Sequence, residues 1–300
     1  MPEGHTLHRL AAQVNRLFAG RHWRVSSPQG RFSAGAARLT ERVPERAEAW
    51  GKQLFVHLGG DIWQVHLGLY GAFSFRGDES FTGAASLGAP RSRAEQYTPR
   101  YDDAGWIIPA PPAGSVRARV QVPNGWADLR GPAKCQVLNP MQYQAVIVRL
   151  GPDPLRQPEG ATDQQLLEQF RGNLDRRRIS IGAALMDQAV IAGVGNIYRA
   201  ESLFVEQLDP DIPVQQLDAA QVASLWETLT GQLRTGVAEG IIRTLRPEDP
   251  LLGARGSDRN PRRHWVYQHQ GTPCLRCGES IRMRELQGRR LYWCPGCQRR

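Results

Sequence analysis

Four of the five cysteines stand near the end of the chain as two close pairs. They are Cys274 and Cys277, then Cys294 and Cys297, with 16 residues between the pairs. Two CxxC pairs at this separation fit four thiolates around one tetrahedral Zn²⁺. Two disulfides are the alternative, but the start of the chain, MPEGHTLHRL, has no apolar signal core, and cytosolic proteins seldom keep disulfides. The spacing therefore predicts one structural Zn²⁺ and leaves Cys135 as a buried thiol.

The residues between the two cysteine pairs have the pattern of a β-hairpin. Residues 281–285 and 291–293 read as strands, and Gly288 falls at the turn. The last 50 residues hold 11 basic against 3 acidic residues, which accounts for +8 of the formal net charge of +9. Such a charge block is often a disordered tail, but the cysteines favour a folded zinc finger. Its surface arginines are expected to bind nucleic acid: Arg282, Arg284, Arg289 and Arg290.

The second residue offers a different chemistry. Removal of Met1 before the small Pro2 would leave a secondary amine at the N-terminus. An α-amine titrates near pH ~8, so a useful fraction is unprotonated and nucleophilic at neutral pH. Such an amine can attack a sugar C1′ and form a cationic iminium, which promotes elimination at the neighbouring carbon. Glu3 stands beside it as a candidate proton donor and acceptor.

Between two expected helices, residues 191–198 read Ile-Ala-Gly-Val-Gly-Asn-Ile-Tyr. The glycines allow a tight turn, and Asn196 stands where a helix cap is expected. Backbone N–H groups at the start of the next helix could then face an anion. A plain helix-turn-helix corner is the alternative for this segment.

The chain has 300 residues, of which 41% are hydrophobic and 22% charged, as in an ordinary globular protein. It holds no run of 18 apolar residues, so we expect no membrane span and a cytoplasmic location. The pI near 9.8 makes a polyanion the expected partner, nucleic acid before an anionic membrane. Lys52 and Lys134 are the only lysines.

Periodicity divides the chain into three kinds of structure. Residues 5–18 predict a helix, and short alternating segments from residue 23 to 137 predict an antiparallel β-sandwich or barrel, with a long mobile loop over residues 77–115. Five helices follow, expected at residues 141–150, 163–170, 179–187, 196–208 and 219–239. The expected domains are residues 1–135 and 136–246, a linker at 247–264, and a zinc finger at 265–299.

These motifs occur together in one known order. Residues 1–4 (Met-Pro-Glu-Gly), residues 50–55 (Trp-Gly-Lys-Gln-Leu-Phe), the Gly-x-Gly-Asn-Ile-Tyr turn and the four-cysteine finger all resemble the formamidopyrimidine-DNA glycosylase and endonuclease VIII family. The resemblance covers essentially the whole chain. It implies an α+β multidomain protein with an N-terminal antiparallel β-sandwich flanked by helices, a central helix-two-turn-helix region and a C-terminal β-hairpin zinc finger. DNA would bind in the cleft between the halves.

The resemblance also assigns roles by matching position. It implies that Pro2 is the Schiff-base nucleophile, Glu3 the general acid and Lys52 the catalytic lysine of a β-hairpin turn. Asn196 would hold phosphates around the lesion, and Arg289 would grip them from the finger and assist the second elimination.

A further glutamate of the family matches Glu201, near the base pocket. A structural ion pair is the equal alternative for this residue.

The branch of the family is indicated by the loop that fills the gap left by a flipped base. Leu69 and Tyr70 resemble the endonuclease VIII wedge, whereas residues 128–132 lack the Arg-Arg-Phe-Gly motif of the other branch. Arg149 resembles an endonuclease VIII phosphate contact, or caps its helix. Oxidised pyrimidines are therefore favoured over formamidopyrimidine and 8-oxoguanine, which remain the alternative substrates.

Two positions depart from the family pattern. His5 and Thr6 replace a second Pro-Glu pair, and Gly68 replaces a glutamine of the wedge. The expected activity is a bacterial, monomeric base-excision-repair glycosylase and abasic-site lyase acting on damaged double-stranded DNA, nucleoid-associated when bound. The alternatives are an abasic-site lyase alone, a catalytically inactive zinc-finger protein that binds damaged DNA, and, more distantly, an RNA-binding zinc ribbon.

Overall fold

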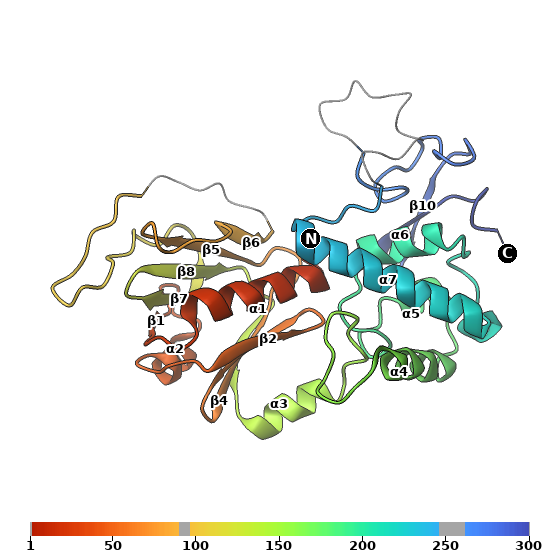
Figure 1. The fold of residues 1–300 in the computed structure, drawn as a ribbon. Helices are drawn as coiled ribbons and strands as arrows, with labels where there is room; N and C mark the ends of the chain where they lie inside the picture. Colours follow the sequence, from red (N-terminus) through yellow and green to blue (C-terminus); the bar gives the residue numbers. More distant parts are fainter. Residues whose placement is uncertain (1, 90–96, 246–261, 300) are drawn as a thin grey trace. The chain divides into compact units, whose positions relative to one another are not determined.

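The computed structural model describes residues 2–89, 97–245 and 262–299. The chain forms two compact units, Met1–Val148 and Arg149–Arg300 (Figure 1). Within the described ranges, no helix is long and apolar enough to cross a membrane. The linker predicted at residues 247–264 falls almost entirely outside the described residues.

The first unit begins with helix α1 (Gly4–Phe18), which confirms the helix predicted there. Its buried apolar residues recur every three or four positions, as expected for a helix that covers one side of a core. Two hydrogen bonds fix its direction against strand β2 (Arg46–Trp50). Asn15 Nδ2 donates to the carbonyl of Ala47 (2.8 Å), and Gly20 N donates to the carbonyl of Pro44 (2.8 Å). The helix and the strand are therefore antiparallel, and the far end of β2 points toward the start of α1.

Two antiparallel sheets make up most of this unit. One has the order β1-β7-β8-β5-β6, and the other the order β2-β3-β4-β9. The strands of the first sheet are β1 (Arg24–Ser26), β5 (Ala72–Gly77), β6 (Ser86–Gly88), β7 (Val116–Val122) and β8 (Gly125–Arg130). Those of the second, besides β2, are β3 (Gln53–Leu58), β4 (Asp61–His66) and β9 (Lys134–Leu138).

A single apolar core joins the two sheets and α1, which makes the unit the predicted β-sandwich. It contains Val56 and Trp63 from one sheet and Phe73 and Val120 from the other. The outer face of the second sheet is covered by helix α3 (Pro140–Ile147), whose Tyr143 packs on Phe55 at a ring distance of 5.0 Å. This helix, predicted over residues 141–150, ends at Ile147.

Two elements of this unit, a helix and a strand, differ from what the sequence pattern predicted. Helix α2 (Ser33–Leu39) falls inside the stretch expected to be β-rich, and strand β6 falls inside the predicted loop of residues 77–115. Residues 90–96 of that loop are outside the described part of the chain. Both elements are short, so they carry too few periodic positions to register in the sequence.

The second unit contains the remaining helices and the cysteines. The helices are α4 (Asp163–Asp175), α5 (Ile181–Ala184), α6 (Asn196–Val205), a 3₁₀ turn η1 (Val214–Gln216) and α7 (Ala219–Glu239). The predicted bounds of α7 are confirmed, whereas α5 is shorter than the nine residues expected. Asp218 caps α7, and Thr162 caps α4, each with a side-chain oxygen that accepts from the backbone N–H of the third helical residue. Gly195, not Asn196, occupies the cap position of α6.

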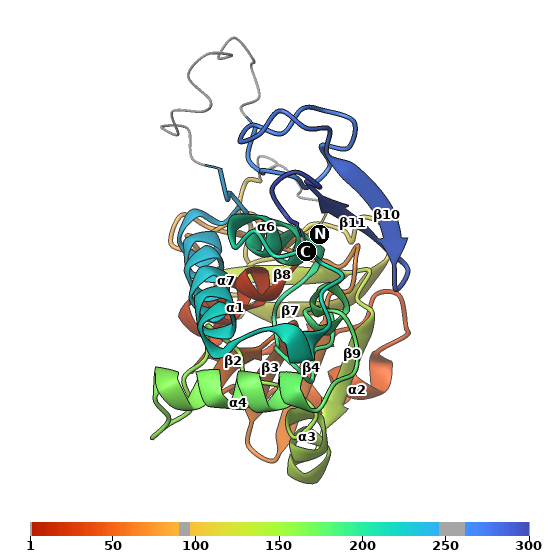
Figure 2. The same cartoon turned by 90° about the vertical axis from the view of Figure 1, so that its right-hand side faces the viewer.

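A two-stranded hairpin completes the unit and packs against α6 (Figure 2). Strands β10 (Arg282–Leu286) and β11 (Arg289–Trp293) pair antiparallel across a two-residue turn. Gln287 and Gly288 both have positive φ, 52° and 68°, the pattern of a type I′ turn. The predicted hairpin is confirmed: β10 lies one residue later than expected, and β11 begins two residues earlier than expected.

Candidate active site and metal centre

Pro2 and Glu3 lie at the start of α1 and are both buried. Glu3 is the residue before the helix, and its carbonyl accepts from Thr6 N (2.9 Å). The next two residues are also buried, and the His5 ring nitrogen Nε2 lies 3.2 Å from the hydroxyl of Thr6. The His-Thr pair that departs from the family pattern is thus an internal contact at the start of the helix. Met1 is outside the described residues.

Lys52 occupies the tip of the hairpin between β2 and β3. Trp50 and Gln53 form the last pair of the ladder, so Gly51 and Lys52 make the two-residue turn. Gly51 has a φ of 58°, which an L-residue with a side chain rarely adopts and which suits the first position of a type II′ turn. Because α1 and β2 are antiparallel, this turn lies toward the end of the helix that carries Pro2 and Glu3.

The predicted wedge residues stand on the loop that follows β4. Leu69 is half-buried, whereas the side chain of Tyr70 is 75% exposed. Gly71 N donates to the carbonyl of Leu67 (2.9 Å), which closes the loop. A Cβ on Gly71 would come within 2.2 Å of that carbonyl oxygen, so only glycine fits there. The loop therefore presents an aromatic ring to solvent from a tight backbone.

In the second unit, Asn196 and the finger hairpin are brought together. Asn196 is the first residue of α6, and its Nδ2 donates to the carbonyl of Arg290 (2.9 Å). Arg199, fully buried one turn later, donates to Asn196 Oδ1 and to the same carbonyl (3.4 Å). Arg289, which precedes Arg290 in the hairpin, is exposed. Asn196 is itself buried, so it holds the hairpin backbone next to a residue that reaches solvent.

Arg149 is exposed at the beginning of the second unit. The chain that follows it is pinned against the turn before α6, since Gly151 N donates to the carbonyl of Gln188 (2.9 Å) and Ala192 N to that of Pro152 (2.9 Å). A Cβ on Gly151 would lie 2.7 Å from the backbone of Val190. Helix α3 ends with Val148 as its C-cap, so Arg149 follows the cap.

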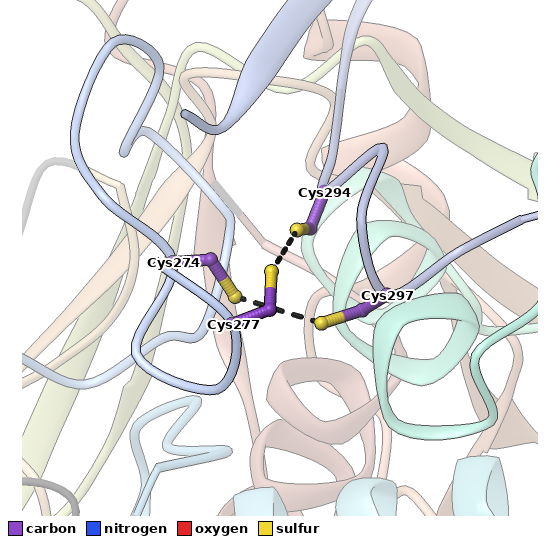
Figure 3. Close-up of side chains that lie close together, drawn as sticks. All are labelled: Cys274, Cys277, Cys294 and Cys297. Carbon is purple, nitrogen blue, oxygen red and sulfur yellow. Dashed lines mark hydrogen bonds between the residues drawn. The ribbon is translucent and has the colours of Figure 1, made fainter. Parts of the chain in front are cut away.

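The four cysteines of the two CxxC pairs converge on one point (Figure 3). Their sulfur atoms all lie within 4.8 Å of one another. Cys274 Sγ is 3.8 Å from Cys297 Sγ, and Cys277 Sγ is 3.4 Å from Cys294 Sγ. All four are free thiols, which argues against the alternative of two disulfides.

This arrangement fits a tetrahedral metal ion. Zinc binds thiolate at about 2.3 Å, so four ligands of a tetrahedron have sulfur atoms about 3.8 Å apart. The backbone supports the same geometry, because Gly278 N donates to the carbonyl of Cys274 (2.9 Å) and Gln298 N to that of Cys294 (2.9 Å), one knuckle for each pair. A Cβ on Gly296 would lie 2.4 Å from Glu279 Oε2 and 2.9 Å from Cys277 Sγ, so the second knuckle packs closely against the first.

Comparison with known proteins connects these features. The N-terminal domain model of formamidopyrimidine-DNA glycosylase matches residues 1–105, and the H2TH domain model of the same enzyme matches residues 150–246. Endonuclease 8 1 of Mycobacterium tuberculosis is 41% identical over 300 residues, covering 99% of this chain and 100% of that protein. The chain belongs to the formamidopyrimidine-DNA glycosylase and endonuclease VIII family. Enzymes of this family are DNA glycosylases with abasic-site lyase activity, and so is this chain.

Other relatives span the same length. A formamidopyrimidine-DNA glycosylase of Parasynechococcus marenigrum is 31% identical over 314 residues, 99% of each chain. A complex of Lactococcus lactis Fpg with abasic-site DNA has a TM-score of 0.71 at 19% identity and covers 99% of this chain and 100% of that one. At that identity the likeness shows the fold alone, which is the fold of the glycosylase family.

Glu201 of this glycosylase anchors the segment that enters the finger. The residue is fully buried on α6. Its Oε1 accepts from Val266 N (2.9 Å) and Tyr267 N (2.8 Å), and its Oε2 accepts from Trp265 N (2.7 Å) and from the hydroxyl of Thr244. These contacts are those of a structural anchor, made with backbone N–H groups rather than with a basic side chain. The base-pocket role of Glu201 stays a prediction.

Replacing Glu201 with glutamine is expected to destabilise the second unit by about 3–5 kcal/mol, because one oxygen that accepts two hydrogen bonds becomes a donor. Urea unfolding measures the free energy of unfolding, and hydrogen exchange at residues 264–267 reports the loss locally. Glu285→Gln is the matched control, since Glu285 is exposed on the finger hairpin, and it should change stability by less than about 0.5 kcal/mol. Equal stabilities for the two variants would contradict the anchor.

The main site residue that the sequence prediction missed is Arg199. It stands three residues after Asn196, hence on the same face of α6, and within the motif that follows the glycine turn. That spacing is the only signal the sequence offered. A buried arginine in this position ties the glycosylase's α6 to both Gly182 and the finger hairpin.

Proposed function

We propose that this enzyme removes oxidised bases, pyrimidines in preference, from damaged double-stranded DNA, and then cleaves the strand through a covalent intermediate on Pro2. The observation that carries the proposal is the common location of Pro2, Glu3 and the Lys52 turn toward one end of α1.

The chemistry follows from the secondary amine. The Pro2 nitrogen attacks C1′ of the damaged nucleotide as the bond from C1′ to the base breaks, and the base leaves with a proton. Protonation of O4′ by Glu3 opens the sugar ring and leaves an iminium between the Pro2 nitrogen and C1′. Because this iminium is cationic, it acidifies the C2′ protons. Loss of one of them expels the 3′ phosphate, and a second elimination expels the 5′ phosphate. Water then releases the enzyme.

The phosphates on either side of the lesion need cationic and hydrogen-bonding groups to hold them. We assign this task to Lys52, Asn196, Arg289 and Arg149. The contact of Asn196 with the backbone of the finger hairpin supports a joint role for Asn196 and Arg289. Of these four residues, Arg149 and Arg289 are exposed and Lys52 is partly buried. Asn196 is buried, and its side chain bonds to Arg290 and Arg199.

The preference for pyrimidines rests on the wedge. The side chains of Leu69 and Tyr70 share one loop, and Tyr70 is exposed enough to enter a duplex. The loop from Gly131 to Ala133 carries no large side chain that could act as a second wedge, because it reads Gly-Pro-Ala. Formamidopyrimidine and 8-oxoguanine are the alternative substrates, and the names of several relatives mention formamidopyrimidine for those proteins.

One structural Zn²⁺ would be held by Cys274, Cys277, Cys294 and Cys297. When bound, it supplies rigidity to the finger rather than reaction chemistry, since four thiolates leave no open coordination position. The finger can then present Arg289 at a fixed distance from α6.

Borohydride trapping tests this function on five duplexes, carrying thymine glycol, dihydrouracil, 8-oxoguanine, formamidopyrimidine or an abasic site. We expect covalent adducts with the abasic site and with both pyrimidines, at least about tenfold faster than with 8-oxoguanine. An undamaged duplex is the control. A catalytically inactive zinc-finger protein would instead bind these duplexes in a salt-sensitive manner and form no adduct. Faster trapping on 8-oxoguanine would reverse the assigned preference.

A further inference from the structure

The only two lysines of the chain are brought to one end of the second sheet. Lys52 is in the turn between β2 and β3, and Lys134 is the first residue of β9, 82 positions later. Between them stands His66, the last residue of β4, which pairs with Gln53 on one side and with Lys134 on the other. Directly opposed residues of antiparallel strands project from the same face of a sheet. Lys134 and His66 are therefore neighbours on the face next to the Lys52 turn.

The direction of the pKa shift of His66 is consistent with positive charge at this end of the sheet. Burial lowers the pKa of His66, and the charges of Lys52 and Lys134 lower it further. The ring is thus neutral at physiological pH, with Nδ1 accepting from Gly68 N (3.0 Å).

A chain of three amide side chains fixes the spacing of the two lysine-bearing strands. Gln136 Nε2 donates to Gln64 Oε1 (2.7 Å), and Gln64 Nε2 donates to Gln53 Oε1 (3.1 Å). Gln64 is fully buried, and both the oxygen and the nitrogen of its side-chain amide form these hydrogen bonds. Gln136 is two residues after Lys134, and Gln53 directly follows Lys52. The amide chain therefore ties β9 to the Lys52 turn.

Lys134 also adjoins the wedge loop. Ala133 N donates to the carbonyl of His66 (2.8 Å), and a Cβ on Gly68 would lie 2.9 Å from the Cβ of Ala133. A Cβ on Gly131 would lie 3.1 Å from the carbonyl oxygen of Tyr70. The loop before β9 thus packs against the loop that carries Tyr70, and it delivers Lys134 beside it.

Lys134 is exposed, and among residues 2–89, 97–245 and 262–299 no carboxylate forms an ion pair with it. Lys134 and the Lys52 turn lie at the same end of the sheet, so this end has a positive potential. An anion that binds at this end of the sheet is therefore favoured.

We propose that Lys134 binds a backbone phosphate of the DNA beside the wedge, as a second lysine contact next to Lys52. The inference rests on the proposed function, because the DNA it contacts is the substrate of that function. Lys134, on β9, would be a fifth phosphate contact in addition to the four residues assigned above. A duplex that is bent or opened at the wedge would bring its backbone to this edge of the sheet.

The salt dependence of binding tests this contact. The probe is a duplex with a tetrahydrofuran abasic analogue, which the enzyme binds without cleaving, titrated between 50 and 200 mM NaCl. Each phosphate contact contributes about −0.9 to the slope of log K against log salt. Lys134→Gln is expected to reduce the magnitude of that slope by about 0.9 and to weaken binding at 50 mM roughly three- to tenfold. Lys134→Arg should restore both quantities.

Arg46→Gln is the matched control. It removes one positive charge from the same sheet, at the end of β2 away from the Lys52 turn, and should leave the slope unchanged. A wild-type slope for Lys134→Gln overturns the proposal, and so does failure of Lys134→Arg to restore binding, which would mean a structural role. Borohydride trapping by the wild-type enzyme distinguishes failure of the Lys134 contact from failure of the proposed function. If the wild type forms the adduct and the Lys134→Gln slope is unchanged, only the contact is refuted. If the wild type forms no adduct, the proposed function is refuted.

Discussion

An enzyme whose Pro2 nitrogen is held in an amide bond is expected to form no borohydride-trapped adduct with abasic-site DNA. An amide lone pair is delocalised into the carbonyl, so it cannot attack C1′. A preparation that retains Met1, or one that carries a short N-terminal extension, has this blocked nitrogen. We expect adduct formation to fall by at least about 1000-fold, equivalent to about 4 kcal/mol of transition-state stabilisation.

The control for this experiment is the same precursor after a protease has removed the extension and left Pro2 as the first residue. Mass spectrometry establishes which N-terminus each sample has, and gel analysis after borohydride treatment measures the adduct. Activity should return in proportion to the fraction of chains that begin with Pro2. Pro2→Gly is a second variant, for which a lower adduct yield is expected. The imine formed by a primary amine can lose its proton and its positive charge, whereas the iminium formed by the Pro2 nitrogen stays cationic. Full adduct yield from the blocked form would exclude the N-terminal amine as the nucleophile.

The sequence was most informative where chemistry demands particular residues at a particular spacing. The spacing of the four cysteines predicted that they meet at one site, and in the structure all four sulfurs lie within 4.8 Å of one another. The hairpin turn at Gly288 was also recognisable, because few residues tolerate a positive φ. Local constraints of this kind act within a few residues and can be read from one chain.

Contacts between distant segments could not be predicted in this way. Glu201 accepts its hydrogen bonds from residues about 65 positions later, and backbone N–H groups leave no mark in a sequence. The amide chain of Gln53, Gln64 and Gln136 depends on the register of three strands, since a shift of one residue would turn these side chains to the other face. Lys134 had no assigned role until the strand order put it opposite His66.

Loss of a cysteine from the cluster is expected to have the largest effect on the second unit. The hairpin β10–β11 is short, and an isolated hairpin is at best marginally stable in water. A structural zinc site contributes an apparent ~10 kcal/mol or more to the folding of such a module. Cys277→Ser should therefore lower the zinc content from one ion per chain to nearly none and unfold the hairpin. Binding to a duplex with an abasic analogue should weaken at least about 100-fold, because Arg289 is no longer held beside Asn196.

The fifth cysteine provides the matched control for this variant. Cys135 lies in β9, outside the cluster, where its sulfur accepts from Trp63 Nε1 (3.5 Å). The residue is half-buried rather than fully buried as predicted, and this burial raises the pKa of its thiol to about 11. Cys135→Ser should keep one zinc per chain by elemental analysis and bind the duplex as the wild type does. If Cys277→Ser also keeps its zinc, or binds DNA normally without it, the finger does not depend on the metal. The exposed arginines of β10 and β11 would then owe their positions to the packing of the hairpin on α6.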